Sequence, residues 1–238
     1  MREVKVHIHP TGPLVALVGN PNCGKTTLFN LLTGSHQKVA NYAGVTVERK
    51  EGKVHLANGK FIRLLDLPGT YSLYPRSQDE RVTCNVLNGR ATGEKRPDLV
   101  ACVVDATNLR RNLRLVLAVK RLGIPVVVVL NMSDVAERRG LTIDVAALSV
   151  ELGLPVVTSV GVKTAGAEAL LAWLAQESWR EQKLSVEPTS GEGNESYQTG
   201  ADHQVVQGIL KRLNLDQLVP MFSPTVSTGC CCTQWAGP

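Results

Sequence analysis

The sequence predicts an α/β fold in which a mostly parallel, six-stranded sheet is flanked by helices on both faces. Continuous apolar runs such as LVALVG at residues 14–19 and IPVVVVLN at residues 124–131 are typical of buried strands, and helical segments separate them. With 238 residues, 43% hydrophobic and 20% charged, the chain can bury one main core and a smaller second unit. In such sheets ligands bind at the carboxyl ends of the strands.

The first part of the chain follows a strand, helix and hairpin pattern. After the strand at 14–19, the segment TTLFNLLTG (26–34) predicts a helix that its final glycine ends. Two further strand patterns, VTVERKEGKVHL (45–56) and KFIRLLDL (60–67), flank Asn58-Gly59. That dipeptide suits the positive backbone angles of a tight turn, so the two strands are predicted to form an antiparallel hairpin.

The rest of the main domain alternates strands and helices. The runs DLVACVVDA, IPVVVVLN and LPVVTS complete the six predicted strands. The helices between and after them are predicted at about 79–92, 111–122, 142–152 and 164–177.

Beyond this region we predict a second, smaller unit. The main domain is placed at residues 1–177 and a small helical domain at residues 178–238. The stretch 185–200 is polar and rich in glycine and serine, which is typical of a flexible linker. Residues 201–219 have helical periodicity and are expected to pack against the helix that contains Trp173 and Trp179. The apolar stripe of this last helix is predicted to comprise Val205, Val206, Ile209, Leu210 and Leu213.

Charge and cysteine content exclude several classes of protein. The net charge of +5 is spread over short clusters that are typical of solvated helix faces, so nucleic acid is not a predicted partner. Cys23, Cys84 and Cys102 are dispersed and Cys230–Cys232 are contiguous, a pattern that favours a reducing compartment over a disulfide framework. No signal peptide pattern is present, and the apolar runs are far shorter than the ~20 residues that cross a bilayer, so the chain as given is expected to be soluble.

The stretch GNPNCGKT (19–26) lies between the first strand and the first helix. It fits the phosphate-binding pattern GxxxxGK[ST], in which glycines let backbone N–H groups converge on a β-phosphate at a helix N-terminus. Lys25 would neutralise the β- and γ-phosphates, and the hydroxyl of Thr26 would bind Mg²⁺. Cys23 occupies a variable position, where a small space-filling side chain is favoured over a redox sensor.

Two strand-end segments favour guanine over adenine. In NMSD (131–134), Asp134 can accept hydrogen bonds from guanine N1–H and the exocyclic amine, a pair of donors that adenine lacks. TSVG (158–161) can offer a backbone N–H to the guanine carbonyl. Met132 stands where lysine is common in such motifs, so ATP remains an alternative ligand.

A third strand-end segment, DLPG (66–69), serves the phosphates. Asp66 can reach Mg²⁺ through water, and the N–H of Gly69 can contact the γ-phosphate. The complete set of predicted nucleotide-binding residues is Gly19, Asn20, Asn22, Cys23, Gly24, Lys25, Thr26, Thr27, Asp66, Gly69, Asn131, Met132, Asp134, Ser159 and Val160.

Five segments together resemble one known family. GNPNCGKTTLFNLLTG, NYAGVTVERKEG, DLPGTYSL, DATNLRRNL and NMSD are similar to the cytosolic N-terminal GTP-binding (G) domain of the ferrous-iron transporter family FeoB, over about Leu14 to Leu174. The resemblance implies a Ras-like P-loop GTPase domain, a small helical domain, and a transmembrane region absent from this chain. It also implies a place on the cytoplasmic side of the bacterial inner membrane. GTP, GDP and Mg²⁺ are the implied ligands, and the transmembrane region and the small proteins FeoA and FeoC are candidate partners.

The resemblance also bears on hydrolysis. It assigns Thr46 to close over Mg²⁺ and the γ-phosphate. Thr70 stands where many GTPases carry a water-orienting glutamine, so hydrolysis is predicted to be slow. In potassium-stimulated relatives an asparagine at the position of Asn22 helps to bind a monovalent cation, which predicts K⁺ stimulation here; the alternative is that Asn22 only hydrogen-bonds the loop backbone. The predicted catalytic residues are Lys25, Thr46, Gly69 and Asn22, and the predicted metal ligands are Thr26, Thr46 and Asp66 for Mg²⁺ and Asn22 for K⁺.

Two functional classes remain open at this point. In the first, the nucleotide state of the chain regulates Fe²⁺ uptake through an attached membrane region. In the second, the chain is a soluble regulatory switch, such as a ribosome-associated GTPase, but no RNA-binding module is visible. His7, His9 and the Cys230–Cys232 tail could suggest iron ligands; exposed strand histidines and an unligated thiol tail are the favoured interpretations.

Overall fold

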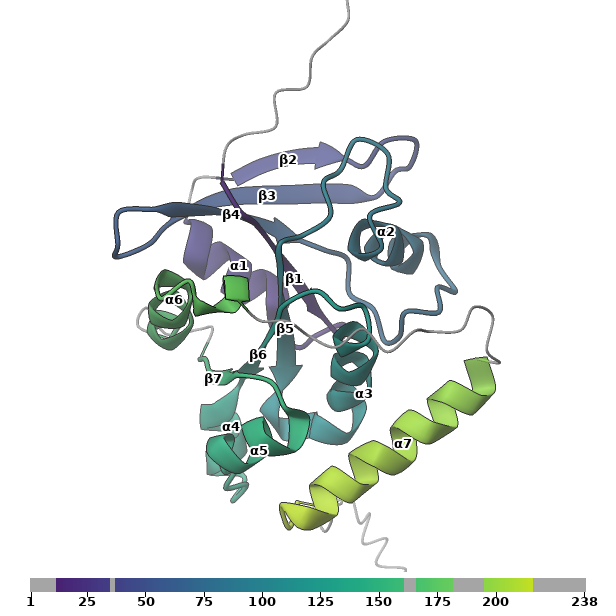
Figure 1. Cartoon of the computed structure of the whole chain (residues 1–238), viewed down its shortest axis with the longest axis vertical. Coiled ribbons are helices and arrows are strands. Elements are labelled where there is room, and N and C mark those ends of the chain that lie inside the picture. Colours follow the sequence, from purple (N-terminus) through teal and green to yellow (C-terminus); the bar gives the residue numbers. More distant parts are fainter. Residues whose placement is uncertain (1–11, 35–36, 161–165, 182–194, 216–238) are drawn as a thin grey trace, which may run out of the picture.

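The computed structural model describes residues 12–34, 37–160, 166–181 and 195–215, with only the backbone described for 195–199. Over these ranges the chain forms one seven-stranded sheet flanked by helices (Figure 1). The residues considered as iron ligands but not favoured, His7, His9 and Cys230–Cys232, lie outside the described residues, as does Gly161 of the TSVG segment.

The sheet has the strand order β2-β3-β4-β1-β5-β6-β7. β1 lies between β4 and β5 and is parallel to both, and the β5–β6 and β6–β7 pairs are also parallel. β2 and β3 extend one side with antiparallel pairings. The strand bounds are β1 Leu14–Gly19, β2 Gln37–Asn41, β3 Glu48–His55, β4 Phe61–Asp66, β5 Leu99–Asp105, β6 Val126–Asn131 and β7 Val156–Thr158.

The pairing registers align the strand ends from which the predicted site residues emerge. Gly19 at the end of β1 is opposite Val103, and Asp66 at the end of β4 is opposite Leu17. Asn131 at the end of β6 is opposite Asp105. Because these strands are parallel, their carboxyl ends form one edge of the sheet.

The described residues form seven strands, one more than the six predicted. The added strand, β2, reads QKVAN, and four of its five side chains are exposed. It pairs with β3 at the outer side of the sheet and buries no apolar face. Since hydrophobic periodicity is the sequence signal for a strand, an exposed edge strand of this kind gives none.

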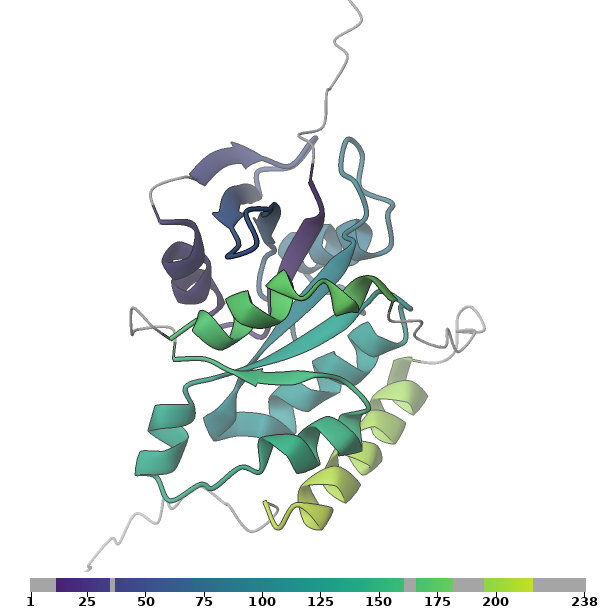
Figure 2. The same ribbon diagram turned by 60° about the vertical axis from the view of Figure 1, so that its left-hand side comes forward.

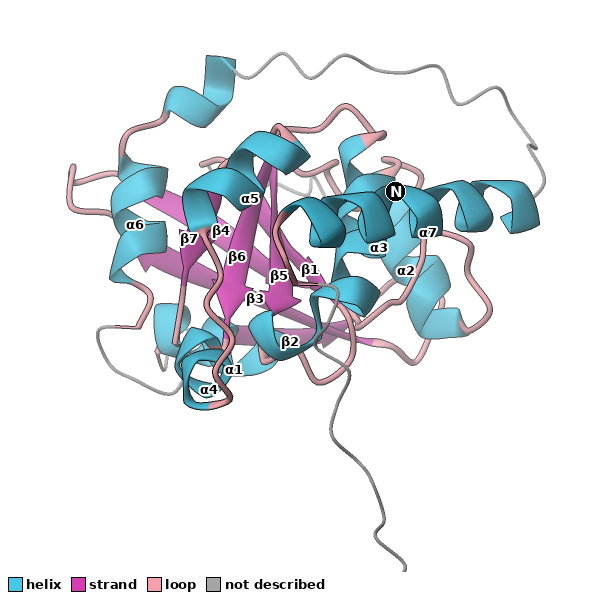
Figure 3. Cartoon of the chain, turned by 90° about the horizontal axis from the view of Figure 1, so that it is seen from below, coloured by secondary structure: helices cyan, strands magenta, loops and turns pink. Residues whose placement is uncertain are grey.

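Helices cover both faces of the sheet (Figures 2 and 3). Buried side chains of α2, α3, α5 and α7 pack on one face, and those of α1 and α6 pack on the other. The helix bounds are α1 Lys25–Thr33, α2 Gln78–Leu87, α3 Leu109–Lys120, α4 Ser133–Arg138, α5 Val145–Leu152, α6 Glu168–Ala175 and α7 Glu195–Arg212, with short 3₁₀ helices at Ala106–Asn108 and Ser178–Glu181. In the described part of the chain, no helix is both long enough and apolar enough to cross a membrane.

The C-terminal helix differs from its prediction in three respects. α7 begins at Glu195, inside the stretch predicted as a linker. Its apolar stripe packs on α3, whereas Trp179 belongs to the cluster on the opposite face of the sheet, so the expected packing against the Trp173–Trp179 helix was wrong. Val205 is 48% exposed and does not belong to the buried stripe, which Val206, Ile209 and Leu210 form.

Candidate functional site

The loop between β1 and α1 turns through two left-handed backbone positions. Asn22 has φ 66° and Gly24 has φ 82°. A Cβ atom at Gly19 would lie 2.6 Å from both Cys23 Sγ and the carbonyl oxygen of Val103, and one at Gly24 would lie 2.3 Å from Asn131 Nδ2. Side chains at these two positions would therefore collide with their surroundings, which explains the fixed glycines of the pattern.

Lys25 and Thr26, the first two residues of α1, both contact Asp66. The Lys25 ammonium forms an ion pair with Asp66 Oδ1, and Thr26 Oγ1 donates a hydrogen bond to Asp66 Oδ2 at 3.1 Å. Lys25 is 8% exposed and Asp66 7%. A hydroxyl and a carboxylate are hard oxygen donors of the kind that Mg²⁺ prefers, so the residues present fit this ion.

The phosphate loop is fastened to the end of β6. Asn131 Nδ2 donates to the carbonyl oxygen of Cys23 at 3.0 Å, in a buried position. Met132 then adopts a left-handed conformation with φ 61°, and α4 begins at Ser133. The sequence predicted that Asn131 belongs to the site; its role as a tie to the loop needed the structure.

Asp134 lies in the first turn of α4 and has a partner that the sequence analysis missed. Its Oδ2 accepts a hydrogen bond from Arg138 at 3.0 Å, and the Arg138 side chain is 72% exposed. An exposed pair of this kind contributes little stability, so it can open at low cost. The i, i+4 spacing of the two residues was the available signal in the sequence.

The predicted loop after β7 lies beside β6. Ser159 N donates to Leu130 O at 2.8 Å, and Val160 N donates to Gly166 O at 2.9 Å. The hydroxyl of Ser159 is buried and has no hydrogen-bond partner within the described residues. Buried polar atoms are normally hydrogen-bonded, so this hydroxyl is suited to a further polar partner.

The DLPG segment packs directly against the phosphate loop. A Cβ atom at Gly69 would lie 3.2 Å from backbone and ring atoms of Pro21, and Thr70 N donates to Gly19 O at 3.1 Å. Thr70 is fully buried, and its hydroxyl donates to Ser72 O at 2.6 Å. The side chain at this position is therefore committed to the protein interior.

Asn20 is buried, whereas Thr46 is exposed. Asn20 is 3% exposed, and neither polar atom of its side chain has a partner in the part of the chain that the structure describes. Thr46 is exposed, on the turn between β2 and β3. Within the described residues it forms no hydrogen bond to Lys25, Thr26 or Asp66.

Cys23 fits the space-filling interpretation. Its side chain is 2% exposed, in the cluster that covers α1. Burial raises the pKa of the Cys23 thiol to about 11. Because the thiolate is the reactive form, a thiol that stays protonated near neutral pH gives no support for redox sensing.

The fold and the site together define a class of protein. A glycine-rich loop joins a strand to a helix, an aspartate ends the neighbouring parallel strand, and an Asn-x-x-Asp segment follows a third strand at the same edge. This arrangement is a Ras-like P-loop GTPase (G) domain.

Comparison with known proteins identifies the family. A family model described as "Ferrous iron transport protein B" matches residues 14–174, and the chain belongs to this family. It is 50% identical over 161 residues to an Fe(2+) transport protein A/Fe(2+) transporter FeoB fusion protein of Porphyromonas gingivalis, covering 67% of this chain and 18% of that protein. The Fe(2+) transporter FeoB of Escherichia coli K12 is 51% identical over 161 residues, covering 66% of this chain and 20% of that protein.

The solved structures agree with this assignment. The cytosolic domain of the T. maritima FeoB iron transporter, in its GMPPNP form, has a TM-score of 0.71 and 30% identity, with 84% of this chain and 98% of that chain covered. The chain spans about a fifth of the length of the curated relatives that it matches.

Proposed function

We propose that the chain binds GTP and GDP with Mg²⁺ and hydrolyses GTP to GDP and phosphate. The observation that carries the proposal is the convergence of the phosphate loop with Asp66 and Asn131 at one edge of the sheet. The T. maritima relative solved in a GMPPNP form supports it.

The phosphate side of the site would work as follows. Backbone N–H groups of residues 19–26 and the ammonium of Lys25 bind the β- and γ-phosphates. Thr26 and Asp66 hold Mg²⁺, which when bound neutralises charge on the phosphate oxygens. Thr46 closes over the γ-phosphate, and the N–H of Gly69 contacts it from the DLPG segment.

The base side of the site would select guanine. Asp134 leaves Arg138 and accepts hydrogen bonds from the base, and Asn131 keeps the phosphate loop in register with this pocket. Met132 covers one face of the base. Ser159 and Val160 would lie on the loop that faces the guanine carbonyl, and the hydroxyl of Ser159, which has no partner among the described residues, would add a polar group there.

Displacement of a fluorescent GDP analogue tests this selectivity. We expect GDP and GTP to displace the analogue and ATP to fail, because ATP would leave the Asp134 carboxylate without donors. Asp134→Ala should weaken GDP binding by at least about tenfold, whereas Arg138→Ala should bind GDP at least as tightly as the parent chain. Equal displacement by ATP and GTP would refute guanine selectivity.

We also propose slow, K⁺-stimulated hydrolysis. Thr70 has no side-chain amide to orient water, and its hydroxyl is already hydrogen-bonded to Ser72 O. A monovalent cation held by Asn22 against the phosphates would stabilise the charge that develops as the β–γ bond breaks. Hydrolysis should be faster in KCl than in NaCl at equal ionic strength, and Asn22→Ala should lose this difference while still binding GDP. Equal rates in the two salts would contradict the proposal.

The wider role of the chain is proposed from its family. Its nucleotide state would regulate Fe²⁺ uptake through a membrane region, with the chain on the cytoplasmic side of the bacterial inner membrane. The P. gingivalis fusion protein supports FeoA as a partner, and FeoC remains a further candidate. The boundary between a G domain at 1–177 and a helical domain at 178–238 also remains a proposal. The ribosome-associated alternative is not favoured, because the curated relatives are iron transporters.

A further inference from the structure

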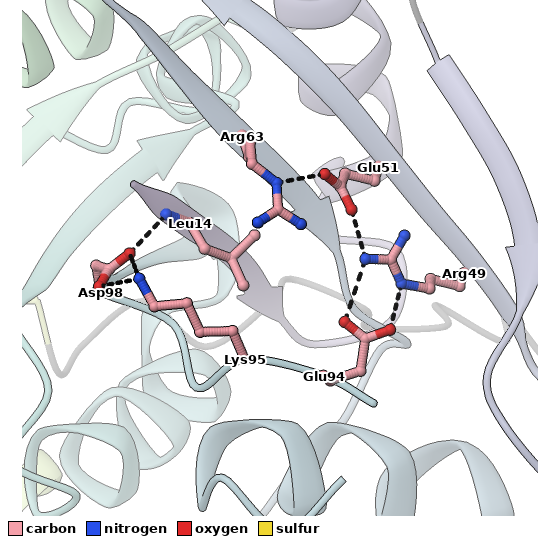
Figure 4. A network of polar contacts seen from close by, with 7 residues as sticks. All are labelled: Leu14, Arg49, Glu51, Arg63, Glu94, Lys95 and Asp98. Carbon is pink, nitrogen blue, oxygen red and sulfur yellow. Dashed lines mark hydrogen bonds and ion pairs between the residues drawn. The ribbon is translucent and has the colours of Figure 1, made fainter. Parts of the chain in front are cut away.

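Four charged, buried side chains form a network that includes Arg49, which follows Thr46 by three residues. The Arg49 guanidinium donates two hydrogen bonds to the Glu94 carboxylate: Nε to Oε1, and Nη2 to Oε2 at 3.1 Å (Figure 4). The same guanidinium pairs with Glu51, which accepts a hydrogen bond from Arg63 Nε at 2.6 Å. The four side chains are 6–16% exposed.

The hydrogen bonds of this network favour the charged forms of Glu51 and Arg49. Burial opposes ionisation of Glu51, but hydrogen bonds from Arg63 and Arg49 outweigh it and lower the pKa of the Glu51 carboxyl. Burial likewise disfavours the charged form of Arg49, but the hydrogen bonds that Arg49 donates to Glu94 and Glu51 outweigh it and raise the pKa of Arg49. Charge-assisted, bidentate pairs of this kind are stronger than neutral hydrogen bonds, and they also fix the relative orientation of the two side chains.

Glu94 belongs to a segment that is fastened to the centre of the sheet. The ammonium of Lys95 contacts both carboxylate oxygens of Asp98 at 2.8 Å. Asp98 Oδ2 in turn accepts a hydrogen bond from Leu14 N, the first residue of β1, at 2.7 Å (Figure 4). β1 carries the phosphate loop at its other end, so the Asp98–Leu14 hydrogen bond joins the segment that contains Glu94 to the strand that leads into the nucleotide site.

A second pair of contacts fastens the same segment to the helices. Arg96 Nε donates to Leu87 O, at the end of α2, at 3.0 Å. Its Nη2 donates to Leu122 O, just beyond α3, at 2.8 Å. Glu94 is therefore a fixed point to which Arg49 attaches the start of β3.

On the other side of Arg49, Thr46 lies on a short turn. Tyr42 N donates to Val47 O at 3.0 Å, and Val45 N donates to Tyr42 O at 3.2 Å. Gly44 has φ 79° in this turn. Tyr42 and Val47 are buried, whereas Gly44 and Thr46 are exposed. The exposed turn is thus bounded by a buried residue at each end, and Arg49 follows two residues after the second, Val47.

From this geometry we infer that the Arg49–Glu94 pair, braced by Glu51 and Arg63, positions Thr46 for GTP hydrolysis. The pair fixes the start of β3, so that only residues 43–46, between the buried Tyr42 and Val47, move when Thr46 closes over the γ-phosphate. A short, anchored segment loses less conformational entropy on closing than a long one. The inference rests on the proposed GTPase activity.

Glu94→Gln tests the inference, because it removes the charge while keeping the shape of the side chain. We expect kcat for GTP and affinity for GMPPNP to fall by about fivefold or more, the usual size of a coupling between two sites. Affinity for GDP should stay within about twofold, because GDP has no γ-phosphate for Thr46 to meet. Arg49→Lys, which keeps the charge but loses the bidentate geometry, should change the same quantities in the same direction.

Asp202→Asn is the matched control. It neutralises another bidentate pair, in which Arg121 contacts the two oxygens of Asp202 at 2.6 and 2.8 Å, between the end of α3 and α7. This variant should keep the parent values of kcat, GMPPNP affinity and GDP affinity. Thermal unfolding of each variant separates a loss of folding from a loss of positioning, and Arg49→Lys decides the matter if Glu94→Gln does not fold.

Three outcomes would overturn the inference. Glu94→Gln could behave as Asp202→Asn does, it could lose GDP and GMPPNP affinity equally, or it could bind GMPPNP more tightly, which would mean that the pair holds Thr46 away from the site. Failure of the proposed function itself would look different, because the parent chain would then neither bind nor hydrolyse GTP.

Discussion

At the scale of single residues, the sequence predicted which side chains gather at the sheet edge better than it predicted what each contacts. Motif spacing placed Lys25 and Asp66 at one edge, and the structure brings them together as an ion pair. The partner of Asp134, Arg138, and the tie from Asn131 to Cys23 O were not predicted. Motifs encode the chemistry of a ligand, whereas these contacts depend on the distances between loops, which the linear sequence does not contain.

The Tyr42 side chain is an exception, within the described residues, to the rule that buried polar groups are hydrogen-bonded. The residue is 5% exposed, and its hydroxyl has no hydrogen-bond partner within the described residues. Burial, with a further contribution from Glu94, raises the pKa of the Tyr42 phenol well above its usual value. The ring fills the core, while the hydroxyl carries a desolvation cost that no hydrogen bond within the described residues offsets.

We predict that Tyr42→Phe stabilises the chain. Removing a buried hydroxyl that has no partner among the described residues should raise the free energy of unfolding by about 1 kcal/mol. Thr83→Val is the opposite control, because Thr83 is fully buried and its hydroxyl donates to Pro68 O at 3.0 Å. That variant should lose about 1–2 kcal/mol. Urea unfolding of the three proteins measures both, and a less stable Tyr42→Phe would show that the hydroxyl has a partner after all.

At the scale of helices and strands, prediction succeeded where one apolar face is continuous. The strands β1, β5 and β6 are buried at almost every position and were predicted from their apolar runs. The exposed strand β2 and the short polar helix α4 were missed, since neither has an apolar stripe. Such elements are held by backbone pairing with a neighbour or by their position in the chain, and hydrophobic periodicity does not detect them.

The C-terminal helix itself was predicted, but the surface on which it packs was not. Its periodicity identified Val206, Ile209 and Leu210, which are buried. The surface that receives them, α3, is distant in sequence and amphipathic in its own right, and several helices offered similar apolar faces. Two ion pairs complement the observed docking: Arg121–Asp202 joins α7 to the end of α3, and Arg212–Glu151 joins α7 to α5.

At the scale of the whole molecule, alternation of strands and helices was sufficient to predict a mostly parallel sheet with two helical layers. The two layers create an interior in which three cysteines are buried: Cys23, Cys84 and Cys102. Burial raises the pKa of the Cys23 and Cys84 thiols to about 11, from an ordinary value of 9.0, and raises that of Cys102 further. These thiols connect the packing of the core to the response of the fold to alkaline pH.

The sign of that response follows from proton binding. Above pH 9 the unfolded chain releases thiol protons that the folded chain retains until about pH 11. The stability contributed by the buried thiols is therefore complete below pH 9 and is lost as the pH rises towards 11. Cys84→Ser keeps a donor for Leu73 O, which Cys84 Sγ contacts at 3.2 Å, but removes the titration. Urea unfolding across this pH range, with a reductant present, should show that stability falls less steeply with pH in Cys84→Ser than in the parent chain. The difference between the two slopes should correspond to at most about one proton per molecule. Identical slopes for the two proteins would mean that the Cys84 thiol titrates alike in the folded and unfolded chains.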